Sequence, residues 1–119
     1  DRMNTYIHEV EKGRVAFRGT PEFQHFNPMG GVHGGWYGTI LDSAMACAVA
    51  TILPKGSIYT TLEYKVNLTR ALKPGALVEC VGTVQHSGRS TAVAQGTIIG
   101  VEDGKLYGTG STTCIIMQP

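Results

Sequence analysis

The pattern of apolar and polar positions predicts one long helix with strands on both sides of it in the chain. Between residues 34 and 53, apolar side chains recur at the three- and four-residue spacings of a broad helical stripe. Pro54 and Gly56 end this pattern. Because the stretch carries almost no charge, we expect this helix to be surrounded by other elements.

Alternating positions bounded by turn residues predict the strands. Residues 61–68 alternate most clearly, with one face formed by Leu62, Tyr64, Val66 and Leu68. Further strands are predicted at residues 14–18, 77–85, 91–101 and 106–117. The layout predicts an α+β fold in which a curved antiparallel β-sheet wraps around one long central helix. Unpaired strand edges of such a sheet lead us to expect a homodimer.

Composition narrows the classes of protein that this chain can belong to. A length of 119 residues and a hydrophobic content of 42% suit one domain spanning residues 1–119. The net charge of +1, without runs of like charge, argues against nucleic-acid or anionic-membrane binding. No apolar run is long enough to cross a bilayer, and no signal peptide is apparent. Three widely spaced cysteines indicate reduced thiols and a cytoplasmic protein.

Residues 25–44 hold the candidate chemistry, because a glycine-rich loop there leads into a helix with a single acid. A helix start offers backbone N–H groups that polarise a carbonyl, and Gly34 allows close approach. Asp42 can attack a carbonyl or activate water. Gly34, Gly38 and Asp42 share one helix face, but eight residues span about 12 Å. The spacing therefore predicts a composite site, in which Asp42 of one subunit faces Gly34 of another.

The stretch from His25 to Ala44 resembles the hotdog-fold acyl-CoA thioesterases of the phenylacetate-pathway and thioesterase superfamily member 2 type. The resemblance rests on Asn27-Pro28, His33-Gly34-Gly35 and Leu41-Asp42-Ser43-Ala44, with support from residues 61–75 and 87–90. It implies a hotdog fold, composite sites in a homodimer, and Asp42 as nucleophile or general base. It also implies that Gly34 and the amide of Asn27 polarise the carbonyl. A hydroxyl expected eighteen residues after the acid is that of Thr60, although Thr61 beside it leaves the register open.

Substrate-binding residues are predicted around the helix start and in two turns. His33 and Gly35 adjoin Gly34, and His33 is more readily explained as a loop anchor than as a base. Arg70 and Arg89 can hold the phosphates of coenzyme A, or they can be solvated surface residues. We expect no metal, since His25 and His33 lack a third ligand at a suitable spacing, and no cofactor.

The predicted function is hydrolysis of a small or medium acyl-CoA to free acid and coenzyme A, by a homodimer or homotetramer. Trp36, Tyr37, Met45 and Phe26 fit an apolar pocket for an aromatic acyl group, but core packing explains them equally well. One alternative is a non-catalytic acyl-CoA-binding module. Another is a hotdog-fold enoyl thioester hydratase or dehydratase, although those enzymes pair a histidine with an additional helix group such as Glu, and this helix has no Glu.

Overall fold

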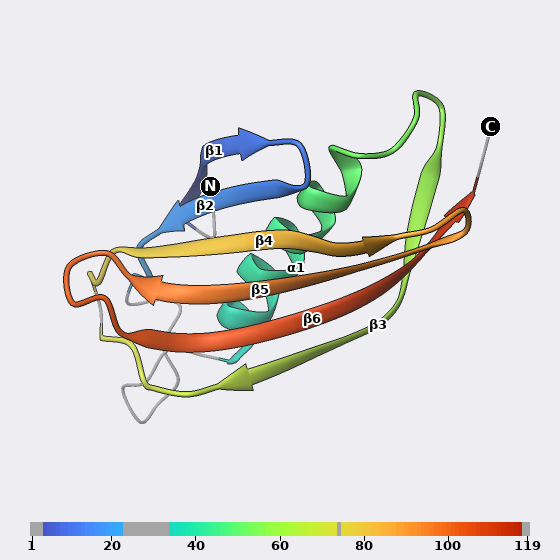
Figure 1. Cartoon of the computed structure of the whole chain (residues 1–119). Coiled ribbons are helices and arrows are strands. Elements are labelled where there is room, and N and C mark those ends of the chain that lie inside the picture. The colour runs from blue at the N-terminus through green and yellow to red at the C-terminus, as the bar shows by residue number, and fades with distance from the viewer. Residues whose placement is uncertain (1–3, 23–33, 74, 118–119) are drawn as a thin grey trace.

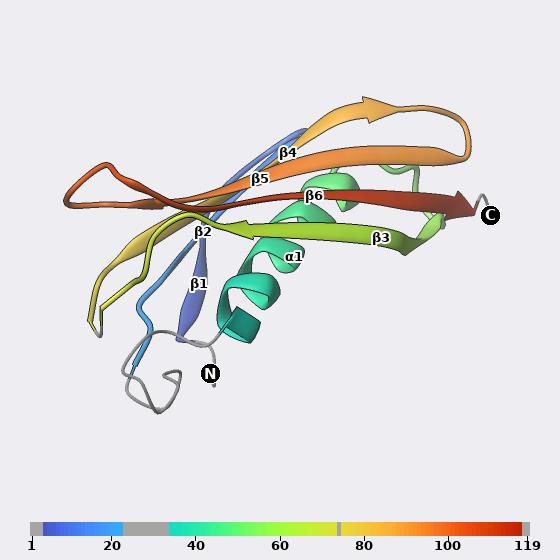
Figure 2. The ribbon, with the colours of Figure 1, turned by 90° about the horizontal axis from the view of Figure 1, so that it is seen from below.

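The computed structural model describes residues 4–22, 34–73 and 75–117, and this part of the chain forms one helix on one face of an antiparallel sheet (Figures 1 and 2). The elements are β1 (Thr5–Glu11), β2 (Arg14–Gly19), α1 (Gly34–Ala50), β3 (Ile58–Leu68), β4 (Val78–Ser87), β5 (Thr91–Gly100) and β6 (Leu106–Met117). The six strands follow the order β1-β2-β4-β5-β6-β3, so β1 and β3 form the two edges. The predicted sheet wrapped around a long helix is confirmed.

Helix α1 buries its apolar stripe against the sheet. The most buried residues of the stripe, at 0–1% exposure, are Ile40, Leu41, Ala44, Met45, Ala48 and Val49. The other side of the helix is open, since Gly35 and Thr39 are exposed and Asp42 is half-buried. The prediction of a helix enclosed on all sides is therefore wrong for the described part of one chain. None of the described residues form a helix long and apolar enough to cross a membrane.

One strand and several element ends differ from the sequence prediction, and β3, for example, begins at Ile58 instead of residue 61. Strand β1 was not predicted, because every residue after Thr5 in it is exposed and its register shifts between Ile7 and Glu9, so no alternation marks it. The helix ends at Ala50 instead of residue 53. The Thr51 hydroxyl donates a hydrogen bond to the Ala48 carbonyl (2.6 Å) and accepts one from the N–H of Gly13 (2.7 Å). This hydroxyl links the end of the helix to the turn between β1 and β2.

A row of three glycines crosses the sheet beneath the helix. Gly82 of β4 lies opposite Gly96 of β5, which lies opposite Gly110 of β6. A β carbon on Gly82 would lie 2.3 Å from the carbonyl oxygen of Ala44, and one on Gly96 would lie 3.0 Å from Leu41. Because these positions lack side chains, the backbone of α1 lies directly against the sheet.

Strand β3 leaves large apolar side chains uncovered on an edge of the sheet. It pairs with β6 on one side only. Its exposed large residues, each 53–60% exposed, are Ile58, Leu62, Tyr64 and Leu68. The register shifts between Thr61 and Glu63, where the Thr112 hydroxyl donates to the Glu63 carbonyl at 3.0 Å. An edge of this kind presents both backbone hydrogen-bonding groups and apolar surface to a further strand.

Candidate active site

A groove on the open side of α1 contains Asp42. The hollow has a volume of about 610 Å³ and lies between the helix and β3. Its lining residues are Gly35, Gly38, Thr39 and Asp42 from α1, and Tyr64 and Val66 from β3. Since Gly35 and Gly38 have no side chains, the helix backbone itself forms part of the floor. A ligand in this groove can therefore approach both peptide groups and a carboxylate.

The carboxylate of Asp42 is half-buried and forms none of the ion pairs found among the described residues. Its neighbours toward the C-terminal end of the helix are neutral groups. Burial, and then the charge of Asp42, raises the pKa of the Cys47 thiol. Burial also raises the pKa of Tyr59, with smaller contributions from Cys47, Cys114 and Asp42. The raised pKa argues against a thiolate at Cys47, and Asp42 is then the candidate nucleophile or general base of the groove.

The start of α1 is suited to stabilising negative charge. The helix begins at Gly34, whose N–H has no acceptor within the helix. No acidic residue in the first turn offsets the positive end of the helix dipole. Because α1 runs unbroken from Gly34 through Asp42, the two residues are separated by about 12 Å. One chain does not bring them to the same carbonyl, as the spacing predicted.

Tyr37 fastens the loop after β3 to the helix start. Its hydroxyl donates a hydrogen bond to the Arg70 carbonyl and accepts one from the N–H of Leu72, each at 3.0 Å. Burial raises the pKa of Tyr37, against a smaller opposing effect of the Leu72 N–H, so the phenol stays protonated and can serve in both bonds. The position of Arg70 therefore depends on the first turn of α1.

Replacing Tyr37 by Phe is expected to lower the free energy of unfolding by about 1–3 kcal/mol, because the N–H of Leu72 then lacks its acceptor in a buried place. Urea unfolding followed by circular dichroism measures this loss. Tyr6→Phe is the matched control, since Tyr6 is 53% exposed, and it should change stability little. Equal stability of the two variants would show that the Tyr37 bridge contributes nothing.

Thr60, the predicted hydroxyl, lies opposite Ile115 of β6, whereas Thr61 lies opposite the fully buried Cys114. Opposed residues of an antiparallel pair project to the same face of the sheet. Thr61 therefore faces the helix and Thr60 faces the other side. Neither threonine lines the groove beside Asp42. The register that the sequence left open favours Thr61 on the side of the helix.

The two predicted arginines lie at opposite ends of the sheet. Arg70 follows β3 next to the β5–β6 hairpin, where the N–H of Thr69 donates to the Tyr107 carbonyl at 3.1 Å. Arg89 lies in the β4–β5 turn, at the other end of these strands (Figure 1). Asp103 of the β5–β6 hairpin has a lowered pKa, mainly because Tyr107 and the Lys105 N–H donate hydrogen bonds to its carboxylate. The charge of Arg70 makes the smallest contribution to this shift. One chain does not place both arginines around one ligand.

The remaining predicted residues divide between the groove, the core and the part of the chain that is not described. Gly35 lines the groove. Trp36, Tyr37 and Met45 are at most 3% exposed and belong to the core, so they do not form an acyl pocket. Asn27 and His33, with His25 and Phe26, lie outside the described residues.

Tyr64 and Val66 are groove residues that sequence reasoning assigned only to the apolar face of a strand. The helix sequence did indicate where the groove lies, because the large side chains all lie on the sheet side and the residues beside Asp42 are small. Strand β3 borders that small-residue side. Its pairing with β6 was needed to see this.

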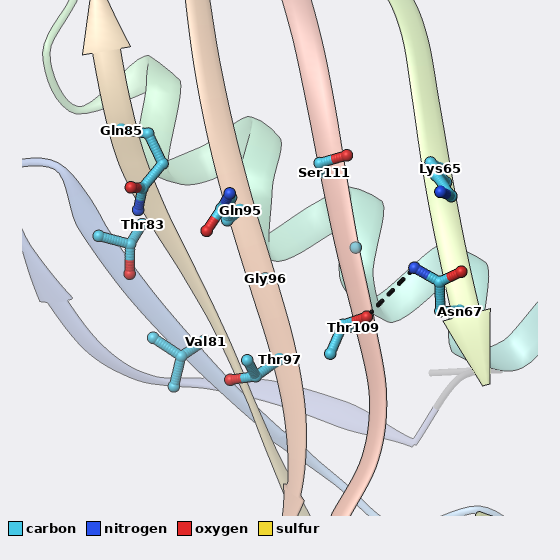
Figure 3. A pocket seen from close by; sticks show the side chains of 11 residues that line it. Lys65, Asn67, Val81, Thr83, Gln85, Gln95, Gly96, Thr97, Thr109 and Ser111 are labelled. Carbon is cyan, nitrogen blue, oxygen red and sulfur yellow. Dashed lines mark hydrogen bonds between the residues drawn. The ribbon is translucent and has the colours of Figure 1, made fainter. Parts of the chain in front are cut away.

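A second hollow, of about 400 Å³, lies on the sheet face opposite the helix (Figure 3). Figure 3 shows amide and hydroxyl side chains around it, with the Asn67 amide donating to the Thr109 hydroxyl at 3.4 Å. Lys65 is the charged residue of its lining, which contains no acid and no histidine. This hollow lacks a general base, so the groove with Asp42 is the better candidate for catalysis.

Comparison with known proteins shows the family to which the chain belongs. The family profile of the thioesterase superfamily matches residues 29–107, which include the helix start and Asp42. The chain belongs to the thioesterase superfamily. A candidate esterase of Caenorhabditis elegans is 30% identical over 111 residues, which are 92% of this chain and 64% of that relative. The chain thus spans less than two thirds of that relative's length.

Solved structures place this thioesterase-superfamily chain in the hotdog fold. Zebrafish thioesterase superfamily member 2 matches with a TM-score of 0.89 and 25% identity, covering 97% of this chain and 84% of that one. A hypothetical thioesterase of Streptococcus pneumoniae, solved with coenzyme A, matches with a TM-score of 0.88 and 24% identity over 96% and 86% of the two chains. The PaaI protein of the Escherichia coli phenylacetic acid degradation operon matches with a TM-score of 0.89 and 19% identity over 98% and 82%.

Proposed function

We propose that this chain is an acyl-CoA thioesterase that hydrolyses small or medium acyl groups, aromatic ones included. The observation that carries the proposal is the carboxylate of Asp42, which forms no ion pair among the described residues, in a groove with a glycine floor, in a chain of the thioesterase superfamily. The coenzyme A bound to the Streptococcus pneumoniae neighbour supports a coenzyme A thioester as substrate. The origin of PaaI in a phenylacetic acid degradation operon supports including phenylacetyl-CoA among the candidates.

Two subunits complete each site in this proposal. Asp42 and Gly34 are separated by about 12 Å along one helix, so each needs its counterpart from another chain. Strand β3 is the proposed contact, because it is an unpaired edge with exposed apolar side chains and it also forms one wall of the groove. A two-fold axis at this edge gives two equivalent sites per dimer. A homotetramer would be a pair of such dimers.

The proposed chemistry divides the work between the subunits. The N–H of Gly34 and the amide of Asn27 donate hydrogen bonds to the thioester oxygen and so stabilise the negative charge that develops on it. Asp42 of the other subunit either attacks the carbonyl carbon or removes a proton from the attacking water. The carbon–sulfur bond then breaks, and coenzyme A leaves as a thiolate that takes up a proton. In the nucleophilic route, water subsequently hydrolyses the acyl-aspartate to release the acid and restore Asp42.

The remaining polar residues have supporting roles in this proposal. The hydroxyl of Thr61 orients the water or the carboxylate, since Thr60 faces away from the helix. His33 and Gly35 contact the substrate at the helix start. Arg70 of one subunit and Arg89 of another hold the phosphates of coenzyme A, since one chain keeps them at opposite ends of its sheet.

The direct test of this function is release of free thiol from a panel of acyl-CoAs, including acetyl-, hexanoyl- and phenylacetyl-CoA. Turnover of at least one substrate at about 1 s⁻¹ or faster is expected of a dedicated enzyme. Hydration of an enoyl-CoA without thiol release would instead support the hydratase alternative. Tight acyl-CoA binding measured by calorimetry, with no turnover, would support the binding module.

Mixed dimers test the composite site. Two differently tagged chains, one with Asp42→Asn and one with Asn27→Ala, are co-expressed, and the mixed dimer is isolated by both tags. One of its two sites then has both substitutions and the other has neither, so about half of the wild-type activity per dimer is expected from the two-fold symmetry. Both parent homodimers should be nearly inactive. Activity of the mixed dimer no higher than that of the parents would rule out a shared site.

A further inference from the structure

Tyr64 lines the groove and reaches across it to the helix at Gly38. Apart from the adjoining residues and the backbone of the helix itself, its hydroxyl is the one described group within 4 Å of a β carbon built on Gly38, at 3.8 Å. Gly38 lies one turn before Asp42 and one turn after Gly34. The phenol of Tyr64 therefore reaches from β3 to the helix halfway between the proposed oxyanion-binding end and the acid.

This side chain is only partly covered by its own chain. It is 54% exposed, whereas Val66, the other β3 residue of the groove, is half-buried against the core. Among the described residues, none of the hydrogen bonds involves the Tyr64 hydroxyl. A large aromatic side chain in this position contributes a rigid wall and a polar tip to whatever enters the groove.

We propose that Tyr64 determines acyl-chain specificity: its ring closes the groove over Gly38 and limits the length of acyl group that fits beside Asp42. The inference rests on the proposed thioesterase function, whose carbonyl lies next to Asp42, so the acyl group extends along the same groove. Gly38 and Tyr64 set the limit together, one by lacking a side chain and the other by filling the space above it.

Two substitutions with opposite expected effects test this role. Tyr64→Ala lengthens the groove and should raise kcat/KM for octanoyl-CoA relative to acetyl-CoA by about 10-fold or more, the discrimination that pocket methylenes provide. Gly38→Ala shortens the groove and should lower the same ratio. The added methyl group meets only an ordinary contact at 3.8 Å, and alanine favours a helix, so this variant should fold at least as well as the wild type.

Two matched variants separate ring size from other effects. Tyr64→Phe keeps the ring and should keep the wild-type chain-length profile. Lys65→Ala changes the next residue of β3, which lines the hollow on the opposite face, and should also leave the profile unchanged. Sedimentation analysis of each variant confirms that the oligomeric state is retained. A Tyr64→Ala profile equal to that of Lys65→Ala, or an equal shift in Tyr64→Phe, would overturn the proposal.

The design distinguishes this inference from the proposed function. If the wild type releases no thiol from any acyl-CoA, the thioesterase function fails, and chain-length preference is then measured by calorimetry with S-alkyl-coenzyme A thioethers. A thioether preference that shifts to longer chains in Tyr64→Ala supports the role of Tyr64 as a length limit in the groove. If the wild type hydrolyses the panel but neither Tyr64→Ala nor Gly38→Ala changes the ratio, only the inference about Tyr64 fails.

Discussion

Replacing Asp42 by Asn is expected to lower kcat for thioester hydrolysis by about 100- to 10,000-fold, the usual contribution of a positioned acid–base group. Asparagine has nearly the shape of aspartate, but it cannot remove a proton from water or form an acyl-enzyme. Since Asp42 forms no ion pair among the described residues, its loss leaves no cation without a partner there. The fold should be unaffected, and KM should change far less than kcat. Stopped-flow or steady-state detection of free thiol measures the effect.

The matched control for Asp42→Asn is Glu102→Gln, which neutralises an exposed acid in the turn between β5 and β6. Its turnover should equal that of the wild type, and both variants should unfold at the same urea concentration as the wild type. A folded Asp42→Asn variant that retains more than about a tenth of wild-type turnover would contradict the proposed role of the carboxylate. The catalytic assignment would then have to move to another residue.

The parts of the fold that the sequence predicted well are those with strong periodicity. The buried stripe of α1 and the strands β4 to β6 alternate or repeat because one side of each packs against a core. Strand β1 lacks such a side, and its exposed residues therefore left no pattern to detect. The glycine row was also missed, because Gly82, Gly96 and Gly110 are far apart in sequence and align only through strand register.

The candidate site was predictable as far as it depends on spacing along one helix. The alignment of Gly34, Gly38 and Asp42 follows from helical geometry alone. The choice between Thr60 and Thr61 depends on which residue of β6 lies opposite each. Tyr64 could be assigned to the groove only once the position of β3 beside the helix was known. Both points depend on how β3 pairs with β6, and no local pattern in the sequence predicts that pairing. The exposed edge of β3 likewise points to a partner whose contacts are not contained in one chain.

The close contact between helix and sheet leads to the largest stability effect that we expect, in Gly82→Ala. The new methyl group would lie 2.3 Å from the carbonyl oxygen of Ala44, 2.4 Å from its carbonyl carbon and 2.6 Å from the nitrogen of Met45. All three are backbone atoms in the middle of α1, so no side-chain rotation relieves the overlap. The free energy of unfolding should fall by about 3 kcal/mol or more, the upper range for overpacked cores. The midpoint of thermal unfolding should fall by more than about 12 °C.

Gly108→Ala is the control for this substitution, since it places the same methyl group on a buried glycine of β6. There the nearest atoms lie at 3.4–3.7 Å, which are ordinary contacts, so stability should change by less than about 1 kcal/mol. Calorimetry of both variants separates the overlap at Gly82 from the general effect of replacing a sheet glycine. Comparable melting temperatures would mean that α1 can move away from the sheet at little cost. Because Asp42 and Gly38 are carried by the same helix, such freedom would also loosen the groove, and Gly82→Ala would then alter turnover before it altered folding.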